Sequence, residues 1–264
     1  MLILLPPSEG KTPAAAGDPV DPAALWLPAL APARRRVVTR LVAMCKRTSA
    51  RSVAESVRAL GLSDGQRDEI ARNAGLATAP AAPAGSVYSG VLYEALDADG
   101  LAADARAWLD ETAVVFSGLW GVVRLADPIP AYRCSIGASL PAPVGGLTAY
   151  WKNVLRKPLD RAAAGGPVLD LRSGAYAAMW SPGGPQAASV RVLHERTVDG
   201  VPRRSIVSHF NKATKGRIVR ALAESGGAPG TIDEVVAVLR DLKFTVEEQP
   251  AGRPRQLDVV VPEL

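Results

Sequence analysis

The fold is decided by the segment Ala113-Val-Val-Phe-Ser-Gly-Leu-Trp-Gly121, which passes from an apolar run into a glycine-containing stretch. Four consecutive apolar residues, Ala113–Phe116, predict a short buried strand. Gly118 and Gly121 then allow backbone conformations that other residues avoid. We therefore expect a central strand that ends in a structured loop.

This loop carries polar and aromatic side chains as far as Arg133. Pro128 and Pro130 restrict its backbone, and ordered loops at strand ends often hold binding or catalytic groups. An ordered loop whose arginines pair with carboxylates would explain the same residues, so both interpretations stay open. Asp127 is accordingly either a catalytic group or the partner that holds an arginine in place. The candidates here are Arg124, Asp127, Tyr132 and Arg133.

The rest of the chain mixes helix and strand patterns without strict alternation. Helical patterns cover 33–47, 51–60, 64–73, 88–97, 101–111, 148–164, 212–224 and 231–240. Strand patterns cover 1–5, 113–116, 167–171, 189–197, 203–210, 243–248 and 256–261, with an Asp-Gly turn between 189–197 and 203–210. The prediction is a mixed α/β (α+β) class with a central mixed sheet and surrounding helices. We expect one domain over 1–264, with a helical insertion over 20–75.

Composition excludes several classes of protein. The chain has 264 residues, is 48% hydrophobic and carries a net charge of +5. It contains no apolar run long enough to cross a membrane, and Met1–Leu5 is too short for a signal sequence. We therefore expect a cytoplasmic protein, and a monomer is favoured. Arg34-Arg35-Arg36 is expected to form a solvated helix face.

Cysteine and histidine are too few for a metal centre. Cys45 and Cys134 lie far apart in the sequence and have no histidine nearby, so small buried thiols are expected. His194 and His209 are the only histidines. The sequence accordingly predicts no metal site and no cofactor.

Positive charge gathers in two parts of the chain, residues 1–80 and, more strongly, residues 151–220. Residues 151–220 carry 13 basic and 4 acidic side chains. Such asymmetry favours a polyanionic partner, either nucleic acid or a phosphorylated small molecule. A solvated basic helix is the alternative for the cluster expected at the start of helix 212–224. The candidate anion-binding residues are Lys11, Arg124, Arg133, Lys152, Arg172, Lys212, Lys215 and Arg217.

The first strand leads into Pro6-Pro-Ser-Glu-Gly-Lys-Thr12. Gly-Lys-Thr suggests a phosphate-binding P-loop, but Leu5 stands where that motif needs its first glycine. What remains is a loop that presents Ser8, Glu9 and Lys11 at a strand end. Glu9, Asp127 and Tyr132 are the candidate catalytic residues, although the sequence leaves open whether the protein is an enzyme.

A helical hairpin is predicted around Leu60-Gly61-Leu62. An apolar-Gly-apolar turn between two helices has the form of a helix-hairpin-helix element, which points helix amides at a DNA phosphate. Gly61 and Arg67 are its candidate residues. Any helical hairpin with a glycine cap has the same pattern, and Asp64, Asp68 and Glu69 oppose phosphate binding.

Taken together, these segments resemble the YaaA peroxide-stress protein family over essentially the whole chain. The resemblance is carried by Ser8–Thr12, Tyr88-Ser-Gly90, Phe116–Gly121, Arg124, Asp127 with Pro130, Tyr132-Arg133, Tyr150-Trp151, Leu169–Tyr176, and Phe210 with Lys212 and Lys215-Gly-Arg217. It implies a cytoplasmic protein that limits free intracellular iron and oxidative DNA damage. It also implies a single α/β fold with a basic cleft and a helix-hairpin-helix-like element, which binds double-stranded or distorted DNA.

Two hypotheses follow for the function. In the first, the basic residues bind DNA phosphates in a strongly salt-dependent manner. In the second, an enzyme or sensor holds a nucleobase-like or phosphorylated small molecule in the same cleft, because carboxylates such as Glu9 repel phosphate but suit acid–base catalysis. A deep pocket would favour the second hypothesis, and a shallow basic groove would favour the first.

Overall fold

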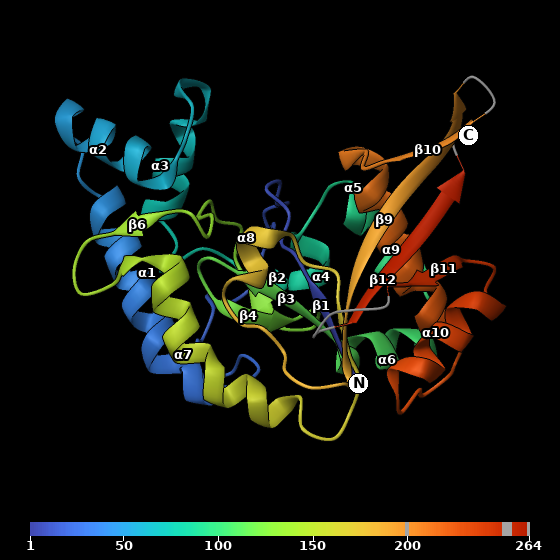
Figure 1. The fold of residues 1–264 in the computed structure, drawn as a ribbon. Coiled ribbons are helices and arrows are strands. Elements are labelled where there is room, and N and C mark those ends of the chain that lie inside the picture. Colours follow the sequence, from blue (N-terminus) through green and yellow to red (C-terminus); the bar gives the residue numbers. More distant parts are fainter. Residues whose placement is uncertain (199–200, 250–254, 263–264) are drawn as a thin grey trace.

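The computed structural model describes residues 1–198, 201–249 and 255–262. Its centre is a mixed sheet in the order β11-β12-β9-β8-β1-β3-β4, with β10 paired to β9. This confirms the mixed α/β class (Figure 1). The strands are β1 (Leu2–Leu5), β3 (Ala113–Ser117), β4 (Gly121–Arg124), β8 (Val168–Asp170), β9 (Ala187–Val198), β10 (Val201–Ser205), β11 (Thr245–Glu248) and β12 (Arg255–Pro262).

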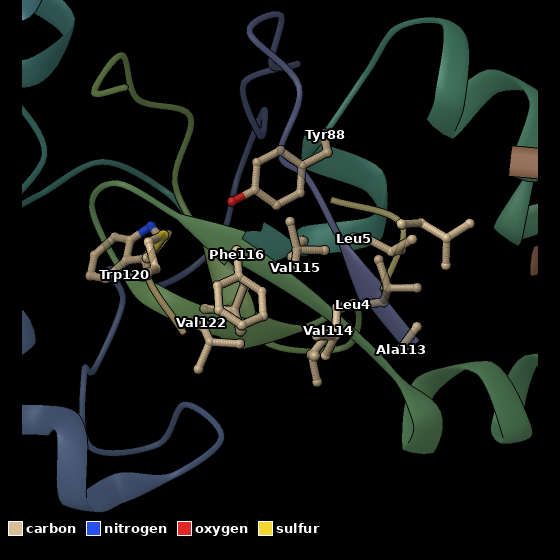
Figure 2. Packing of buried hydrophobic residues seen from close by; sticks show 14 of the residues in the cluster. Leu4, Leu5, Tyr88, Ala113, Val114, Val115, Phe116, Trp120 and Val122 are labelled. Atoms are coloured by element: carbon tan, nitrogen blue, oxygen red, sulfur yellow. The ribbon is translucent and has the colours of Figure 1, made fainter. Parts of the chain in front are cut away.

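The sheet is built around β1, which is parallel to β3 on one side and to β8 on the other. Every residue of β1 and β3 is buried, which explains why both read as continuous apolar runs. Tyr88 and Val115 lie on one side of β3, and Val114 and Phe116 on the other (Figure 2). Core packing on both faces therefore fixes the register of the central strands.

Helices pack around the sheet, and several of them form one end of the molecule beyond the sheet (Figure 1). Most lie within a few residues of the predicted ranges. They are α1 (Ala31–Cys45), α2 (Ala50–Leu60), α3 (Asp68–Ala74), α4 (Ala84–Val87), α5 (Val91–Leu96), α6 (Ala103–Thr112), α7 (Leu147–Ala162), α8 (Gly174–Ala177), α9 (Ser208–Glu224) and α10 (Ile232–Asp241). Short strand pairs join β2 (Ala82–Pro83) to β5 (Pro128–Ile129) and β6 (Ser139–Leu140) to β7 (Gly145–Gly146).

Several predicted boundaries are wrong. The strand expected over 203–210 ends at Ser205, and α9 begins at Ser208. Lys212 therefore lies one turn inside α9 and not at its start. The helix expected over 88–97 begins only at Val91, because Gly90 has a φ of 98°, which interrupts the helix. The predicted Asp-Gly turn lies outside the described residues.

The helical hairpin is present within the segment 20–75. Ser49 caps α2 by accepting a hydrogen bond from the amide of Ser52, and Gly61 ends the helix with a φ of 64°. Two exposed arginines of the hairpin are paired with its own carboxylates, Arg67 with Asp64 and Arg72 with Glu69. The glycine-ended helical hairpin is therefore present, while part of its positive charge is already balanced.

Arg34 corrects the expectation of a fully solvated arginine run. Its side chain is completely buried, and its guanidinium donates to the backbone oxygens of Trp26 and Val122 at 2.7 Å and of Trp120 at 3.1 Å. The arginine therefore joins α1 to the β3–β4 turn. Arg35, its neighbour, is exposed and pairs with Asp21.

Candidate functional site

A pocket of about 850 Å³ opens beyond the carboxyl ends of β1 and β8. In the sheet, β1 lies between β3 and β8, so the chain connections from β1 and to β8 diverge to opposite sides of β1. Ligands of open α/β sheets characteristically bind at such a topological switch point. The lining comes from the β1 loop, the start of α5, the segment 132–137, the segment 171–176 and α9: Pro6–Lys11, Ser89–Tyr93, Tyr132–Gly137, Leu171, Ser173, Ala175, Tyr176, Ile206, Asn211, Lys212 and Lys215.

The loop after β1 is held in a defined conformation. The Ser8 hydroxyl donates to the backbone oxygen of Gly10 at 2.5 Å and accepts from the amide of Ser89 at 3.1 Å. Lys11 forms an isolated β-bridge with Tyr88. The polar end of Lys11 is consequently placed at the pocket rather than free on a flexible loop.

Lys11 is the most strongly perturbed cation of the pocket. Its Nζ donates to the backbone oxygens of Ser8 at 2.8 Å and Glu9 at 3.4 Å. The same atom lies 4.4 Å from the ring centre of Tyr132, within the range of a cation–π contact. Burial, followed by the positive charge of Arg133, lowers the pKa of Lys11 to about 8.

A buried hydroxyl chain lies beneath Lys11. Tyr132 Oη is 2.6 Å from Ser117 Oγ and 2.9 Å from Tyr88 Oη. Ser117 Oγ accepts from the amides of Leu119 and Trp120, so its own proton is directed to Tyr132. Burial raises the pKa of Tyr132 and of Tyr88 above the ordinary tyrosine value, and both phenols stay protonated at neutral pH.

Arg133 forms a second cation at the pocket. Its backbone is fixed by Asn73, which donates from Nδ2 to the Arg133 oxygen at 2.7 Å and accepts from the Arg133 amide at 3.0 Å. Its guanidinium pairs with the Glu9 carboxylate at 2.6 Å. Glu9 is 80% exposed while Arg133 is only 17% exposed, so an incoming anion can compete with Glu9 for this arginine.

Two further lysines come from α9. Lys215 Nζ donates to the backbone oxygen of Leu171 at 2.9 Å, and burial lowers the pKa of Lys215. Lys212 is exposed at the pocket mouth. The structure thus brings together six of the predicted site residues: Glu9, Lys11, Tyr132, Arg133, Lys212 and Lys215.

The other candidates lie outside the residues that line this pocket. The Asp127 carboxylate accepts from the amides of Trp26 and Arg124 and so organises the backbone, while burial raises its pKa. The Arg124 guanidinium lies over the ring of Trp26. Arg172 is buried beneath the pocket, pairs with Asp170 and packs 4.1 Å from the ring centre of Phe116.

Lys152 and Arg217 are exposed and do not line the pocket, and Gly61 and Arg67 lie in the helical hairpin. Sequence reasoning missed Asn73 and Tyr93 as parts of the pocket's framework. Tyr93 donates from its hydroxyl to the Pro6 oxygen at 2.8 Å. The Tyr88-Ser-Gly90 motif was the available signal, because it brings the start of α5 beside the β1 loop.

The cysteine environment does not favour thiolate chemistry. Cys134 lines the pocket, and burial raises the pKa of its thiol to about 12. Burial also raises the pKa of Cys45, to about 11. Both therefore stay protonated and poorly nucleophilic at neutral pH. In the part of the chain that the structure describes, no group of three or more His, Cys, Asp or Glu residues is arranged to hold a metal ion.

Comparison with known proteins identifies the family. The family model described as peroxide stress protein YaaA matches residues 1–249. The chain belongs to the YaaA peroxide-stress protein family. A UPF0246 protein of Streptomyces coelicolor is 50% identical, with the whole of both chains covered.

Other relatives match over most or all of the chain. A UPF0246 protein of Corynebacterium efficiens is 40% identical, covering 99% of this chain and all of its own. An uncharacterized protein of Campylobacter jejuni is 27% identical over 85% of each chain. Membership in the YaaA family supports a role in peroxide stress. Within the described ranges, no helix is both long and apolar enough to cross a membrane.

Proposed function

We propose that this YaaA-family protein binds DNA, double-stranded or distorted, through phosphate contacts at the mouth of the basic pocket. The observation that supports this most strongly is the meeting of Lys11, Arg133, Lys212 and Lys215 at one pocket. These cations come from three separate parts of the chain. The acidic side chain among them, Glu9, is largely exposed and already paired with Arg133.

Exposed cations outside the pocket would extend this surface. Lys152 and Arg217 are exposed, which leaves both side chains accessible to phosphates. The helical hairpin contributes less, since Arg67 and Arg72 are already paired with carboxylates and the amides of Gly61, Leu62 and Ser63 donate within the hairpin. The contacts are to the backbone, so we expect weak sequence preference.

The test is binding of fluorescent duplex and bubble-containing DNA, measured by anisotropy. Arg133→Met and Lys212→Met should each weaken binding to both DNAs. Lys243→Met is the matched control, because Lys243 is exposed and lies between α10 and β11, outside the pocket. Equal affinities for all three variants and the native protein would contradict the proposal.

A second candidate is a phosphorylated or nucleobase-like small molecule held inside the pocket. The volume of about 850 Å³ lies within the range of small-molecule sites, and Tyr176 adds an aromatic wall. Calorimetry with nucleoside monophosphates, followed by competition against labelled DNA, separates the two. A nucleotide that binds and displaces DNA would favour the small-molecule site. Absence of nucleotide binding would leave DNA as the remaining candidate ligand.

We further propose that the protein acts in the cytoplasm and limits free iron during peroxide stress, a role supported by the family resemblance. The direct test is the level of chelatable iron in peroxide-treated cells that lack the gene. Native protein should lower that level, and the Arg133→Met variant should do so less. An equal iron level with and without the gene would contradict this role.

A further inference from the structure

Lys11 differs from the other pocket lysines in the partners of its amine. Two of its protons are directed at the backbone oxygens of Ser8 and Glu9, and its Nζ also faces the rings of Tyr132 and Tyr88 at 4.4 and 5.4 Å. Among the described residues, no carboxylate lies within ion-pairing distance of Lys11, since Glu9 pairs with Arg133. The ammonium is therefore half-buried at a pocket wall without a counter-ion.

This environment favours the neutral amine. The groups that act on the Lys11 charge are Arg133, which lowers its pKa, and Glu9, Glu69 and Cys134, which raise it less than burial lowers it. With a pKa of about 8, about one molecule in ten carries a neutral amine at pH 7, against roughly one in 3,000 for an ordinary lysine. Neutral lysine amines are nucleophiles that form Schiff bases with carbonyl compounds.

The surroundings of Lys11 specify which carbonyl compound would fit. Arg133, Lys212 and Lys215 offer cationic groups to a phosphate. Tyr176 offers an aromatic surface and Ser135 a hydroxyl at the same pocket. Lys215 is less suited to attack a carbonyl, because the Asp170 carboxylate acts on its charge and favours the ammonium form.

We propose that Lys11 Nζ forms a Schiff base with the aldehyde of a deoxyribose phosphate unit, such as an abasic position in DNA. The amine lone pair attacks the aldehyde carbon, and the carbonyl π electrons pass to oxygen, which takes one of the two protons that the nitrogen gives up. The resulting hydroxyl then leaves as water with a second proton, and the nitrogen lone pair forms the C=N bond. One amine and one aldehyde thus give one imine and one water.

The DNA form of this inference rests on the proposed DNA binding, and borohydride trapping tests it. Full-length protein is incubated with a duplex that contains one abasic site and is treated with sodium borohydride, which reduces an imine to a stable amine. A duplex with a tetrahydrofuran residue, which has no aldehyde, is the matched control. Free 2-deoxyribose 5-phosphate forms a third arm. We expect a covalent adduct with the abasic duplex and none with the tetrahydrofuran duplex.

Variants and peptide mapping decide whether Lys11 is the nucleophile. Lys11→Arg keeps the positive charge but cannot form the imine, so it should lose the adduct while still binding the tetrahydrofuran duplex. Lys11→Met should also lose the adduct, and Lys243→Met should retain it. A thermal melt checks that each variant folds. An adduct that persists in Lys11→Arg, or that maps to another lysine, would overturn the assignment.

The failure of this inference is distinguishable from failure of DNA binding. If the protein binds the tetrahydrofuran duplex but traps no aldehyde, the Lys11 chemistry is wrong and the binding proposal stands. If it binds no DNA but traps deoxyribose phosphate on Lys11, the chemistry stands with a small-molecule ligand, and the DNA proposal falls.

Discussion

Removing the Tyr132 hydroxyl tests whether the pocket floor depends on the buried hydroxyl chain. In Tyr132→Phe the aromatic face beside Lys11 is kept, but hydrogen bonds of 2.6 and 2.9 Å are lost. The Ser117 hydroxyl, whose oxygen already accepts two amide protons, then loses its acceptor at 2.6 Å. Tyr88 loses its donor at the same time.

The expected cost follows from these two unsatisfied groups. Each buried polar group left without its partner costs about 1–3 kcal/mol, so Tyr132→Phe should lower the free energy of unfolding by about 2–6 kcal/mol. Tyr88→Phe breaks the 2.9 Å bond and leaves the Tyr132 hydroxyl without this acceptor, so it should cost about 1–3 kcal/mol. The double variant should cost less than the sum of the two, because both single changes remove the same bond.

Urea unfolding followed by circular dichroism measures all three variants. A double-mutant cycle isolates the coupling between Tyr88 and Tyr132, with the slope of the transition checked for two-state behaviour. A cost below about 0.5 kcal/mol for Tyr132→Phe, within the usual range of a surface change, would refute the reasoning. Strict additivity of the two single changes would refute the shared hydrogen bond.

Three further expectations can be checked with single variants or pH changes. Arg34→Met should destabilise the protein by about 3–5 kcal/mol because it leaves buried backbone oxygens without a donor. The exposed control Arg35→Met should cost about 0.5 kcal/mol or less, and thermal denaturation compares the two variants. Phosphate-ligand affinity should fall as the pH rises through about 8, because Lys11 loses its charge there, and this part of the fall should be absent in Lys11→Met titrated by calorimetry. Cys134 should react slowly with iodoacetamide at pH 7 in the native state and quickly in urea, since burial raises its pKa to about 12; fast native alkylation would contradict its burial.

Local sequence patterns predicted the strands well where burial is complete. The Ala113–Phe116 run is apolar because both faces of β3 are covered, and this produces an unambiguous pattern. The end of β10 was missed because Ile206 and Val207 continue an apolar pattern while being exposed. Alternation in the sequence does not reveal that the backbone turns into α9 there.

The sequence predicted a site rich in basic side chains, but it did not show which of the basic residues line the pocket. The charge pattern identified Lys11, Arg133, Lys212 and Lys215, which the fold brings to one pocket. The same pattern could not separate them from Arg172, whose charge is neutralised by Asp170 in the core. Likewise, the run Arg34–Arg36 gives no sign that Arg34 finds backbone oxygens from the β3–β4 turn. Those partners are distant in sequence and depend on tertiary structure.

The most direct test of the proposed phosphate surface is the salt dependence of DNA binding. Affinity for one duplex is measured over a series of salt concentrations for the native protein, for Lys212→Met/Lys215→Met and for the control Lys243→Met. Each lost phosphate contact reduces the slope of log affinity against log salt by about 0.9, so we expect the double variant to have a slope smaller by about 1.8 and the control to match the native protein. Equal slopes for the native protein and the double variant would contradict phosphate binding at this pocket.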